Sequence, residues 1–433
     1  MQVYRAVLVF CFLSIIISCN TIKSPLFGKR SAREKYADAI TTAGLNESAL
    51  GRAWFRAGDK ALAQPQTVTL PYKETGFFAA DQPSGAGYSF SVTRGENIVV
   101  TLSSNPDSVQ VFVELWQPGN QKPSLRTAMD TLSKDLKFTA TKNDSFIVRI
   151  QPELLVDLEY TITITTQPSL AFPVDKSGNP RLISFWGNER DNGARDHEGV
   201  DIGAKFRTPA LAAANGIISR VTLNNLGGKV VFLRDENTGN NLYYAHLDSQ
   251  IAVTGQKVTI GDTIGLVGKT GNARNTVPHL HFGIYTIGGA VDPLPFINTN
   301  TKEPGKITAP TQYINRFLRT TSSGLYREPA AKSSKEPVIE KNEIVFVLAA
   351  TGDWYKVKLP NDTIGYINSR SLTDKILDKL LLTDDQKLRV KPLADSPSKR
   401  LLAAGEKVDV MGGYHNFYFV NFKGIEGWIA RPE

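Results

Sequence analysis

Four of the five histidines in this sequence lie in three short motifs between residues 197 and 281. The motifs read DHEGVD, YYAHLD and PHLHF, and the first of them also contributes the carboxylate of Asp201. Imidazole nitrogens and a carboxylate oxygen are ligands that zinc takes in catalytic sites, where three protein ligands leave one coordination position for water. The clustering therefore predicts a hydrolytic metal site.

The downstream pair of histidines has the spacing of a strand. His279 and His281 are two residues apart, so a strand would turn both rings to one face of a sheet. Leu280, Phe282 and Ile284 alternate with them and would form the buried face. The pattern predicts a half-buried strand that carries two imidazoles.

The upstream pair, His197 and Asp201, lies four residues apart, and its glycine and apolar neighbours favour a loop that runs into a strand. These two side chains and one histidine of the downstream pair complete a three-ligand set. The other histidine would lie beside the metal, free to transfer protons, and His246 could face the same site. Glu198 invites comparison with H-E-x-x-H enzymes, but position 201 is Asp, so we expect Glu198 to be a solvated neighbour.

The region from about residue 183 to 297 resembles the lysostaphin-type (LytM-type) zinc endopeptidases, which cut peptide cross-links in bacterial cell walls. The resemblance rests on HEGVDIGAKFRTPALAAANGII, YYAHLD and GQKVTIGDTIGLVGKTGNARNTVPHLHFGIY. It implies an antiparallel β-sheet with an open groove and one zinc ion per chain.

The resemblance also implies a role for each residue of the site. His197, Asp201 and His281 would bind zinc. His279 would be the general base that activates water, and His246 would donate a hydrogen bond to the oxyanion. Some relatives lack these residues and serve as non-catalytic activators, whereas all five are present here. A structural metal site, or a cupin-like barrel that also uses H-x-H, remains an alternative for the motifs.

Composition excludes some classes of partner. The chain has 50 basic and 42 acidic residues among 433, which gives a formal charge of +8. This excess fits affinity for anionic cell-wall polymers or lipid headgroups, and it fits an incidental surface charge equally well. No basic tract indicates a nucleic-acid partner.

Residues 1–18 have the pattern of an export signal, with Arg5 followed by the apolar run AVLVFCFLSIII, which is too short to span a bilayer comfortably. The signal ends in Ile-Ile-Ser before Cys19 and resembles a bacterial lipobox, whose cysteine is acylated. A lipid on Cys19 would hold the protein to a membrane through a tether at 19–30. Ordinary cleavage nearby, or a buried cysteine, is the alternative. We expect an outer-membrane lipoprotein facing the periplasm, or a cell-surface one.

The whole chain predicts a mainly β, multidomain protein. A helical hairpin is expected at 31–65, beginning with a capping box at Ser31, and Asn46 is the expected cap of its second helix. About seven alternating strands at 66–166 predict a β-sandwich with a spacer, docking or groove-shielding role. A proline-containing linker precedes the peptidase domain, which we expect at 183–298.

The C-terminal part contains an internal repeat. GLYREP, DWYKV and GYINSRSL recur as KLRVKP, NFYFV and GWIARPE at offsets of 63, 63 and 62 residues. The units at 312–374 and 375–433 resemble bacterial Src-homology-type barrels, which often bind cell-wall peptides or glycans. Five aromatic residues of the two units could line a groove, namely Trp354, Tyr355, Tyr366, Tyr418 and Trp428. For the two tryptophans, core positions are favoured instead. His415 is expected in a solvated turn.

The sequence therefore predicts an exported, lipid-anchored zinc endopeptidase that hydrolyses peptide cross-links of peptidoglycan. Both D-amino-acid and glycine–glycine cross-links remain candidate bonds. One alternative is a non-catalytic peptidoglycan-binding or amidase-activating scaffold. Another is a zinc peptidase that acts on exported proteins or oligoglycine peptides.

Overall fold

The computed structural model describes residues 30–130, 133–190, 193–322, 324–331, 335–336 and 339–432. The predicted export signal, Cys19 and all of the tether except Arg30 lie outside these ranges. Among the described residues, no helix has both the length and the apolar character needed to cross a membrane.

Two helices, α1 (Ala32–Thr42) and α2 (Ala49–Ala63), form the hairpin expected near the N-terminus. The predicted capping box is present, because Ser31 and Glu34 each accept a hydrogen bond from the other's backbone amide. Trp54 of α2 is 1% exposed and packs on a neighbouring β-sheet. Burial of this aromatic side chain fixes the hairpin to the rest of the fold.

The cap of the second helix differs from the prediction. Ser48 is the N-cap of α2, and its hydroxyl accepts a hydrogen bond from the amide of Gly51 at 3.0 Å. Asn46 instead lies in a single 3-10 turn that follows Gly44, whose φ is 70°. The prediction of Asn46 as the cap is wrong because this extra turn shifts the start of α2 by two residues.

A β-sandwich follows the hairpin. Its nine strands are β1 (Gln66–Thr67), β2 (Tyr72–Phe78), β3 (Ala86–Val92), β4 (Glu96–Asn105), β5 (Val111–Gln117), β6 (Ser124–Ala128), β7 (Asp135–Thr139), β8 (Asp144–Pro152) and β9 (Leu158–Pro168). One sheet has the order β1-β3-β8-β5-β6, and the other contains β2-β9-β4-β7. Side chains such as Ile98, Ile150 and Ile162 are fully buried between the two sheets.

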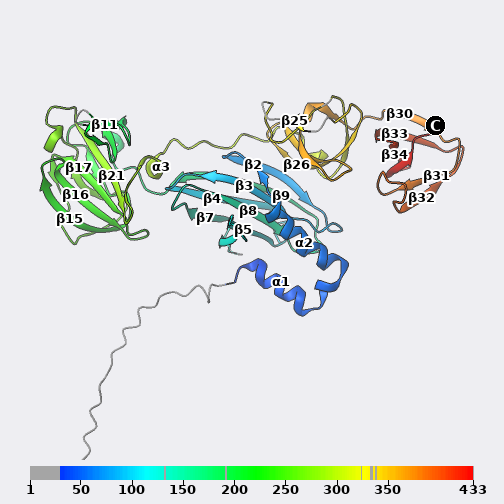
Figure 1. Ribbon diagram of the computed structural model, residues 1–433, viewed down its shortest axis with the longest axis horizontal. Coiled ribbons are helices and arrows are strands. Elements are labelled where there is room, and N and C mark those ends of the chain that lie inside the picture. The colour runs from blue at the N-terminus through cyan, green and yellow to red at the C-terminus, as the bar shows by residue number, and fades with distance from the viewer. Residues whose placement is uncertain are drawn as a thin grey trace, which may run out of the picture.

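The histidine motifs lie in a second β-rich domain (green in Figure 1). Its elements are β10 (Arg181–Ser184), β11 (Glu189–Arg190), β12 (Arg195–Asp196), β13 (Val200–Gly203), β14 (Pro209–Leu211), β15 (Gly216–Asn224), β16 (Gly228–Asp235), β17 (Asn241–Leu247), β18 (Ser249–Gln250), β19 (Lys257–Val258), β20 (Thr263–Leu266), β21 (His279–Thr286), β22 (Gly289–Val291) and α3 (Leu294–Ile297). The main sheet is antiparallel in the order β10-β13-β21-β17-β16-β15-β19, which confirms the predicted antiparallel sheet.

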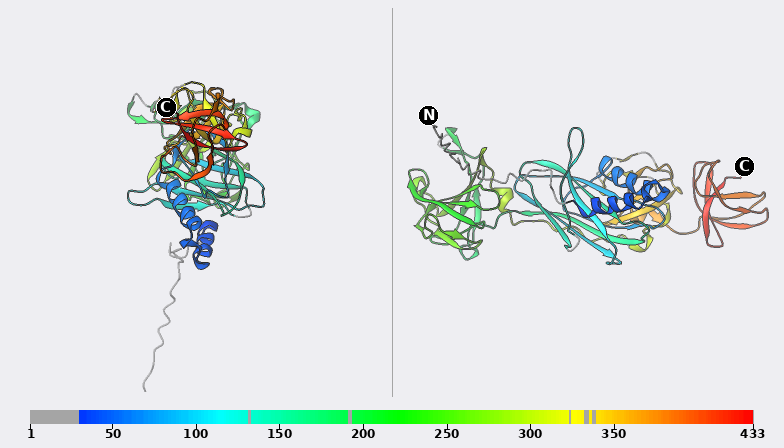
Figure 2. Two further views of the ribbon diagram at one scale, coloured as in Figure 1. Left: turned by 90° about the vertical axis from the view of Figure 1, so that its right-hand side faces the viewer. Right: turned by 90° about the horizontal axis from the view of Figure 1, so that it is seen from below.

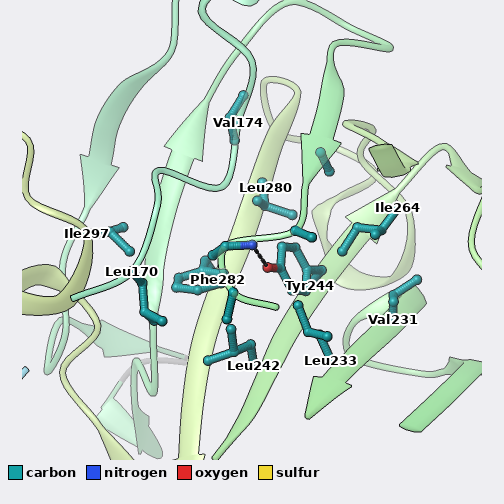
Figure 3. Close-up of a cluster of buried hydrophobic side chains, with 14 of the residues drawn as sticks. Leu170, Val174, Val231, Leu233, Leu242, Tyr244, Ile264, Leu280, Phe282 and Ile297 are labelled. Carbon is teal, nitrogen blue, oxygen red and sulfur yellow. Dashed lines mark hydrogen bonds between the residues drawn. The ribbon is translucent and has the colours of Figure 1, made fainter. Parts of the chain in front are cut away.

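One face of this sheet carries the core of the domain. Leu280, Phe282 and Ile284 of β21 are fully buried, as their alternation predicts. Figure 3 shows two of them beside Tyr244 of β17, whose hydroxyl accepts a hydrogen bond from the amide of Ala213 at 2.9 Å. The opposite face of the same strands is therefore left to carry the polar site.

The segment before β10 belongs to this domain and is not a free linker. Leu170 and Val174 pack in the core, and Val174 forms a β-bridge with Ala210. The amide of Leu170 also donates to the carbonyl of Phe296, which lies in α3, at 2.9 Å. The segments that enter and leave the domain therefore lie side by side. The entry segment is held in place because its apolar residues, Leu170 and Val174, are buried in the core.

Two small barrels form the C-terminal part. The first contains β23 (Phe317–Thr320), β24 (Leu325–Tyr326), β25 (Lys335–Glu336), β26 (Ile344–Thr351), β27 (Trp354–Lys358), β28 (Ile364–Asn368) and β29 (Leu372–Thr373). The second contains β30 (Asp378–Leu381), β31 (Gln386–Arg389), β32 (Ser398–Leu402), β33 (Lys407–Tyr414), β34 (Phe417–Phe422) and β35 (Ile425–Ala430). β26, β27 and β28 correspond to β33, β34 and β35, as the sequence repeat predicts.

The barrel aromatics are mostly buried. Trp354 and Trp428 are buried, as expected, and His415 lies exposed in a turn. Tyr355 and Tyr366 are at most 1% exposed, so the expectation that they line a binding groove is wrong for these two residues. Tyr355 packs in the core of the first barrel, whereas Tyr366 is buried against Tyr72 of the sandwich.

The first barrel is joined to the sandwich by a shared sheet. β26 pairs with β2, with Thr75 opposite Ala350 and Gly76 opposite Ala349. The two barrels also share an apolar cluster that includes Phe317 of the first. Figures 1 and 2 show the result, an elongated chain with the histidine-bearing domain at one end and the second barrel at the other.

Candidate active site

His197 follows the β11–β12 hairpin and precedes β13, in the loop that the sequence predicts. Its Nδ1 lies 2.8 Å from the carbonyl oxygen of Phe185, which can only accept, so Nδ1 carries the ring proton. Its Nε2 therefore presents a lone pair 3.0 Å from Oδ1 of Asp201 and 2.9 Å from Nδ1 of His281. The backbone contact thus fixes both the tautomer and the direction of the ring.

Asp201 and His281 face each other across a pair of strands. They are direct partners in the register of β13 and β21, and Oδ1 of Asp201 lies 3.0 Å from Nδ1 of His281. Gly199 makes room for this arrangement, because a Cβ atom there would lie 2.6 Å from the His281 ring and 2.7 Å from the carbonyl of Phe282. The glycine in the first motif is therefore required by the packing of the site.

Arg190 holds the second oxygen of the Asp201 carboxylate. Its Nη2 donates to Oδ2 of Asp201 at 2.8 Å and to Oγ of Ser184 at 2.6 Å. Burial alone would raise the pKa of Asp201, but the neighbouring imidazoles of His197 and His281 hold that pKa well below its usual range. The carboxylate is thus ionised, with Oδ2 engaged and Oδ1 facing the histidines.

The two remaining histidines of the motifs lie beside this group. Nε2 of His279 is 3.9 Å from Oδ1 of Asp201, and its Nδ1 lies 2.8 Å from the carbonyl oxygen of Val277. The His246 ring centroid is 4.9 Å from that of His279, and its Nδ1 lies 2.9 Å from the carbonyl oxygen of Thr270. The structure therefore brings all five predicted site residues together.

His246 has an unusual backbone for its residue type. Its φ is 61°, in the left-handed region that non-glycine residues rarely adopt, and such strain is concentrated at functional sites. Burial, together with the nearby imidazoles of His279 and His281, lowers the pKa of His246 to about 4. The neutral ring donates through Nδ1 and presents a lone pair at Nε2, so the predicted donor role requires a second proton on Nε2.

These side chains line an open groove with a volume of about 890 Å³. All of its lining residues come from 183–285, so no described residue of the sandwich or the barrels contributes to its wall. Exposed apolar side chains, including Leu226 and Val277, border it at 56% and 63% exposure. The groove is therefore open to an extended ligand along its length.

His197, Asp201 and His281 together form what we call the ligand group. One potential ligand atom from each lies within 4.8 Å of the other two. Atoms bound tetrahedrally to one zinc ion at about 2.0–2.1 Å would lie about 3.3 Å apart, close to the observed 2.9–3.0 Å. Two imidazoles and one carboxylate are also the chemistry zinc takes in hydrolytic sites, so the residues fit this ion.

Comparison with known proteins agrees with this geometry. Residues 195–293 match the model of peptidase family M23, and residues 323–373 match the bacterial SH3 domain. This chain contains a domain of peptidase family M23. The M23 domain is the one that carries the ligand group and the groove, and the SH3 match falls on the first C-terminal barrel.

Three of the similar proteins are named as peptidases. The chain is 34% identical over 139 residues to the L-Ala–D-Glu endopeptidase of Bacillus subtilis, covering 29% of this chain and 42% of that relative. It is 40% identical over 86 residues to the peptidoglycan DD-endopeptidase ShyC of Vibrio cholerae, covering 20% of this chain and 19% of that relative. The catalytic domain of lysostaphin from Staphylococcus simulans is 30% identical, with 27% of this chain and 92% of that chain covered and a TM-score of 0.25. The chain thus spans less than half of the length of these two curated relatives.

Sequence reasoning did not find Arg190 or the backbone acceptors of the M23 domain. Arg190 stands in the polar run NERDNGARD, where nothing distinguishes it from Arg195. The carbonyl groups of Phe185, Thr270 and Val277 orient the imidazoles, but a main-chain oxygen has no residue signature. These contacts are visible only once the loops are placed in space.

We expect the Arg190→Met variant to bind zinc about 10–100-fold more weakly, because the released Asp201 carboxylate can rotate away from the ligand group. Competition with a chelating dye would measure the affinity. Arg207→Met is a suitable control, since Arg207 pairs with Asp248 at the surface at 3.3 Å. Equal zinc affinity for both variants would show that Arg190 does not hold the ligand.

Proposed function

We propose that this protein is a zinc-dependent endopeptidase that hydrolyses peptide cross-links of peptidoglycan. The observation that carries the proposal is the convergence of three ligand atoms on one point. The Phe185 carbonyl orients His197, Arg190 holds Asp201, and the strand register places His281 opposite Asp201. Two further imidazoles beside them, in an open groove, supply the groups that proton transfer needs. The names of the similar proteins support peptidoglycan as the substrate.

Zinc held by the ligand group would lower the pKa of a water molecule to about 7 and polarise the scissile carbonyl. Nε2 of His279 is placed to accept a proton from the attacking water, because its Nδ1 proton is already donated to Val277. The water oxygen bonds to the carbonyl carbon, and His279 then gives its proton to the amide nitrogen as the C–N bond breaks. No side chain bonds covalently to the substrate in this scheme.

The ring of His246 lies beside those of His279 and His281, with centroids 4.9 and 5.9 Å away. In this mechanism it stabilises the oxyanion through Nε2–H, in the form that carries a proton on both ring nitrogens. Its backbone strain and its contact with Thr270 keep the ring directed at the groove. The division of labour between His279 and His246 remains a prediction from the family resemblance.

Digestion of purified peptidoglycan by the full-length protein tests the proposed function. We expect new stem-peptide ends in the mass spectrum, which disappear with a chelator and return when zinc is added. Intact peptidoglycan that nonetheless retains the protein would contradict the peptidase and support the non-catalytic scaffold. Cleavage that a chelator leaves unchanged would contradict the metal.

We also propose that the protein is exported and held to a membrane by a lipid on Cys19. The lipobox-like end of the signal in the sequence supports this. Metabolic labelling with a clickable fatty acid would tag the wild type, and Cys19→Ser would lose the label. A labelled Cys19→Ser protein would contradict the anchor.

A further inference from the structure

A row of aromatic side chains crosses the floor of the groove next to the ligand group. Phe232 of β16 is paired in register with Tyr243 of β17, and Tyr243 is paired with Gly283 of β21. Gly283 follows His281 by two residues, so it lies on the same face, about 7 Å further along the strand. Tyr285 follows by two more. We call Phe232, Tyr243 and Tyr285 the aromatic row.

The rings of the aromatic row contact one another and the site. Tyr243 is 4.8 Å from Phe232, 6.0 Å from Tyr285 and 5.8 Å from His281 between ring centroids. All three aromatic residues line the groove and are partly exposed within it. The proposed mechanism gives none of them a role.

Gly283 keeps the row open at its centre. A Cβ atom at this position would lie 3.2 Å from Cε2 of Tyr285 and 3.2 Å from the carbonyl oxygen of Glu198, which is tighter than ordinary van der Waals contact. A larger residue would therefore fill the space between Tyr243 and Tyr285. The glycine therefore leaves this apolar surface open directly beside the ligand group.

The two ends of this surface carry opposite charges. Glu198 is exposed and lines the groove, and after burial its charge is the largest influence that raises the pKa of Tyr285 to about 12. At the far end Arg220, which is paired with Phe232 in register, places its guanidinium 5.6 Å from that ring centroid. A cation on the aromatic row is therefore attracted to the Glu198 end and repelled from the Arg220 end.

We propose that the aromatic row and Glu198 form a specificity subsite for a substrate residue whose aliphatic side chain ends in a primary amine. The methylene groups of such a side chain would lie on Tyr243, and the ammonium would pair with the Glu198 carboxylate beside Tyr285, while Phe232 would contact the neighbouring part of the substrate. The inference rests on the proposed function for the peptide nature of the substrate. Diamino acids in cross-linked stem peptides have this chemistry.

Binding and cleavage of a defined peptide test the subsite separately from the catalytic step. The probe is a cross-linked stem-peptide dimer with a free side-chain amine, compared with the same dimer after N-acetylation. Zinc-loaded full-length His279→Ala protein would be titrated with each dimer by calorimetry, so that affinity is measured without turnover. We expect about tenfold tighter binding of the free-amine dimer. Equal affinity for the two dimers, or no binding of either, overturns the subsite.

Substitutions then assign the preference to residues. In the same background, Glu198→Gln should remove the preference for the free amine and leave the acetylated dimer unaffected. Tyr243→Leu and Phe232→Leu keep apolar bulk and should weaken binding of both dimers by several-fold. Phe206→Leu is the control, because Phe206 is an exposed aromatic residue of the same domain that does not line the groove.

The outcomes distinguish this inference from the proposed function. Binding with the expected preference but no cleavage by the wild type would contradict the peptidase and keep the subsite. Cleavage without any effect of Glu198→Gln or the leucine variants would overturn the subsite and keep the peptidase. Tighter binding of a dimer that still carries its glycan, with no effect of N-acetylation, would show that the aromatic row binds sugar and would also overturn it.

Discussion

The His279→Ala variant should lose about 10²- to 10⁴-fold in hydrolysis of peptidoglycan and still bind one zinc ion. His279 is not part of the ligand group, and its Nε2 lies 3.9 Å from the nearest Asp201 oxygen, whereas the three ligand atoms lie within 3.0 Å of one another. Removing its imidazole deletes a proton acceptor and leaves the ligands in place. Released amines would report turnover, and atomic absorption would report zinc.

Two further histidine variants make the test specific. His197→Ala should lose zinc and turnover together, because it removes one of three ligands. His415→Ala should keep both, because His415 lies exposed in a turn of the second barrel. Loss of zinc from His279→Ala would show that our division between ligand and base is wrong.

The site could be predicted from the sequence because its chemistry is concentrated in rare residue types. Histidine is scarce in this chain, so four of five in three motifs is a strong signal. The strand period then placed His279 and His281 on the face opposite Leu280 and Phe282, as the structure has them. Arg190 carried no such signal, because arginine is common at surfaces and its partner is 11 residues away.

The fold could be predicted in its parts but not in how they join. Alternating strands and the repeat indicated a sandwich and two barrels, and each is present. The pairing of β2 with β26 joins segments about 270 residues apart in sequence, and nothing in either strand marks an exposed edge. Burial of Tyr355 and Tyr366 follows partly from the same joint, since Tyr366 contacts Tyr72 of the sandwich at 3.2 Å between hydroxyl oxygens.

A buried carboxylate holds this joint together. Glu74 of β2 is fully buried and accepts hydrogen bonds from the hydroxyls of Tyr72, Tyr88 and Tyr160 at 2.5, 2.7 and 3.0 Å. Its cationic partner comes from the first barrel, with Nζ of Lys356 3.7 Å away. Burial and the charge of Glu74 raise the pKa of Tyr72 well above its usual range, so its hydroxyl remains a donor. The network therefore centres on Glu74, which accepts hydrogen bonds within the sandwich and pairs with a cation of the first barrel.

We expect Glu74→Ala to destabilise this joint by about 3–5 kcal/mol, because it leaves three hydroxyls and the Lys356 ammonium buried without their acceptor. Hydrogen exchange should accelerate in β2 and β26 together, by about 10²- to 10⁴-fold, while β21 of the M23 domain keeps its protection. Glu159→Ala is the control, because Glu159 is exposed on the adjoining strand β9.

Faster exchange in β2 with unchanged protection in β26 would mean that the strand pairing, and not Glu74, secures the barrel to the sandwich. Coupled exchange would instead mean that the barrel cannot detach as a separate module without breaking the sandwich core.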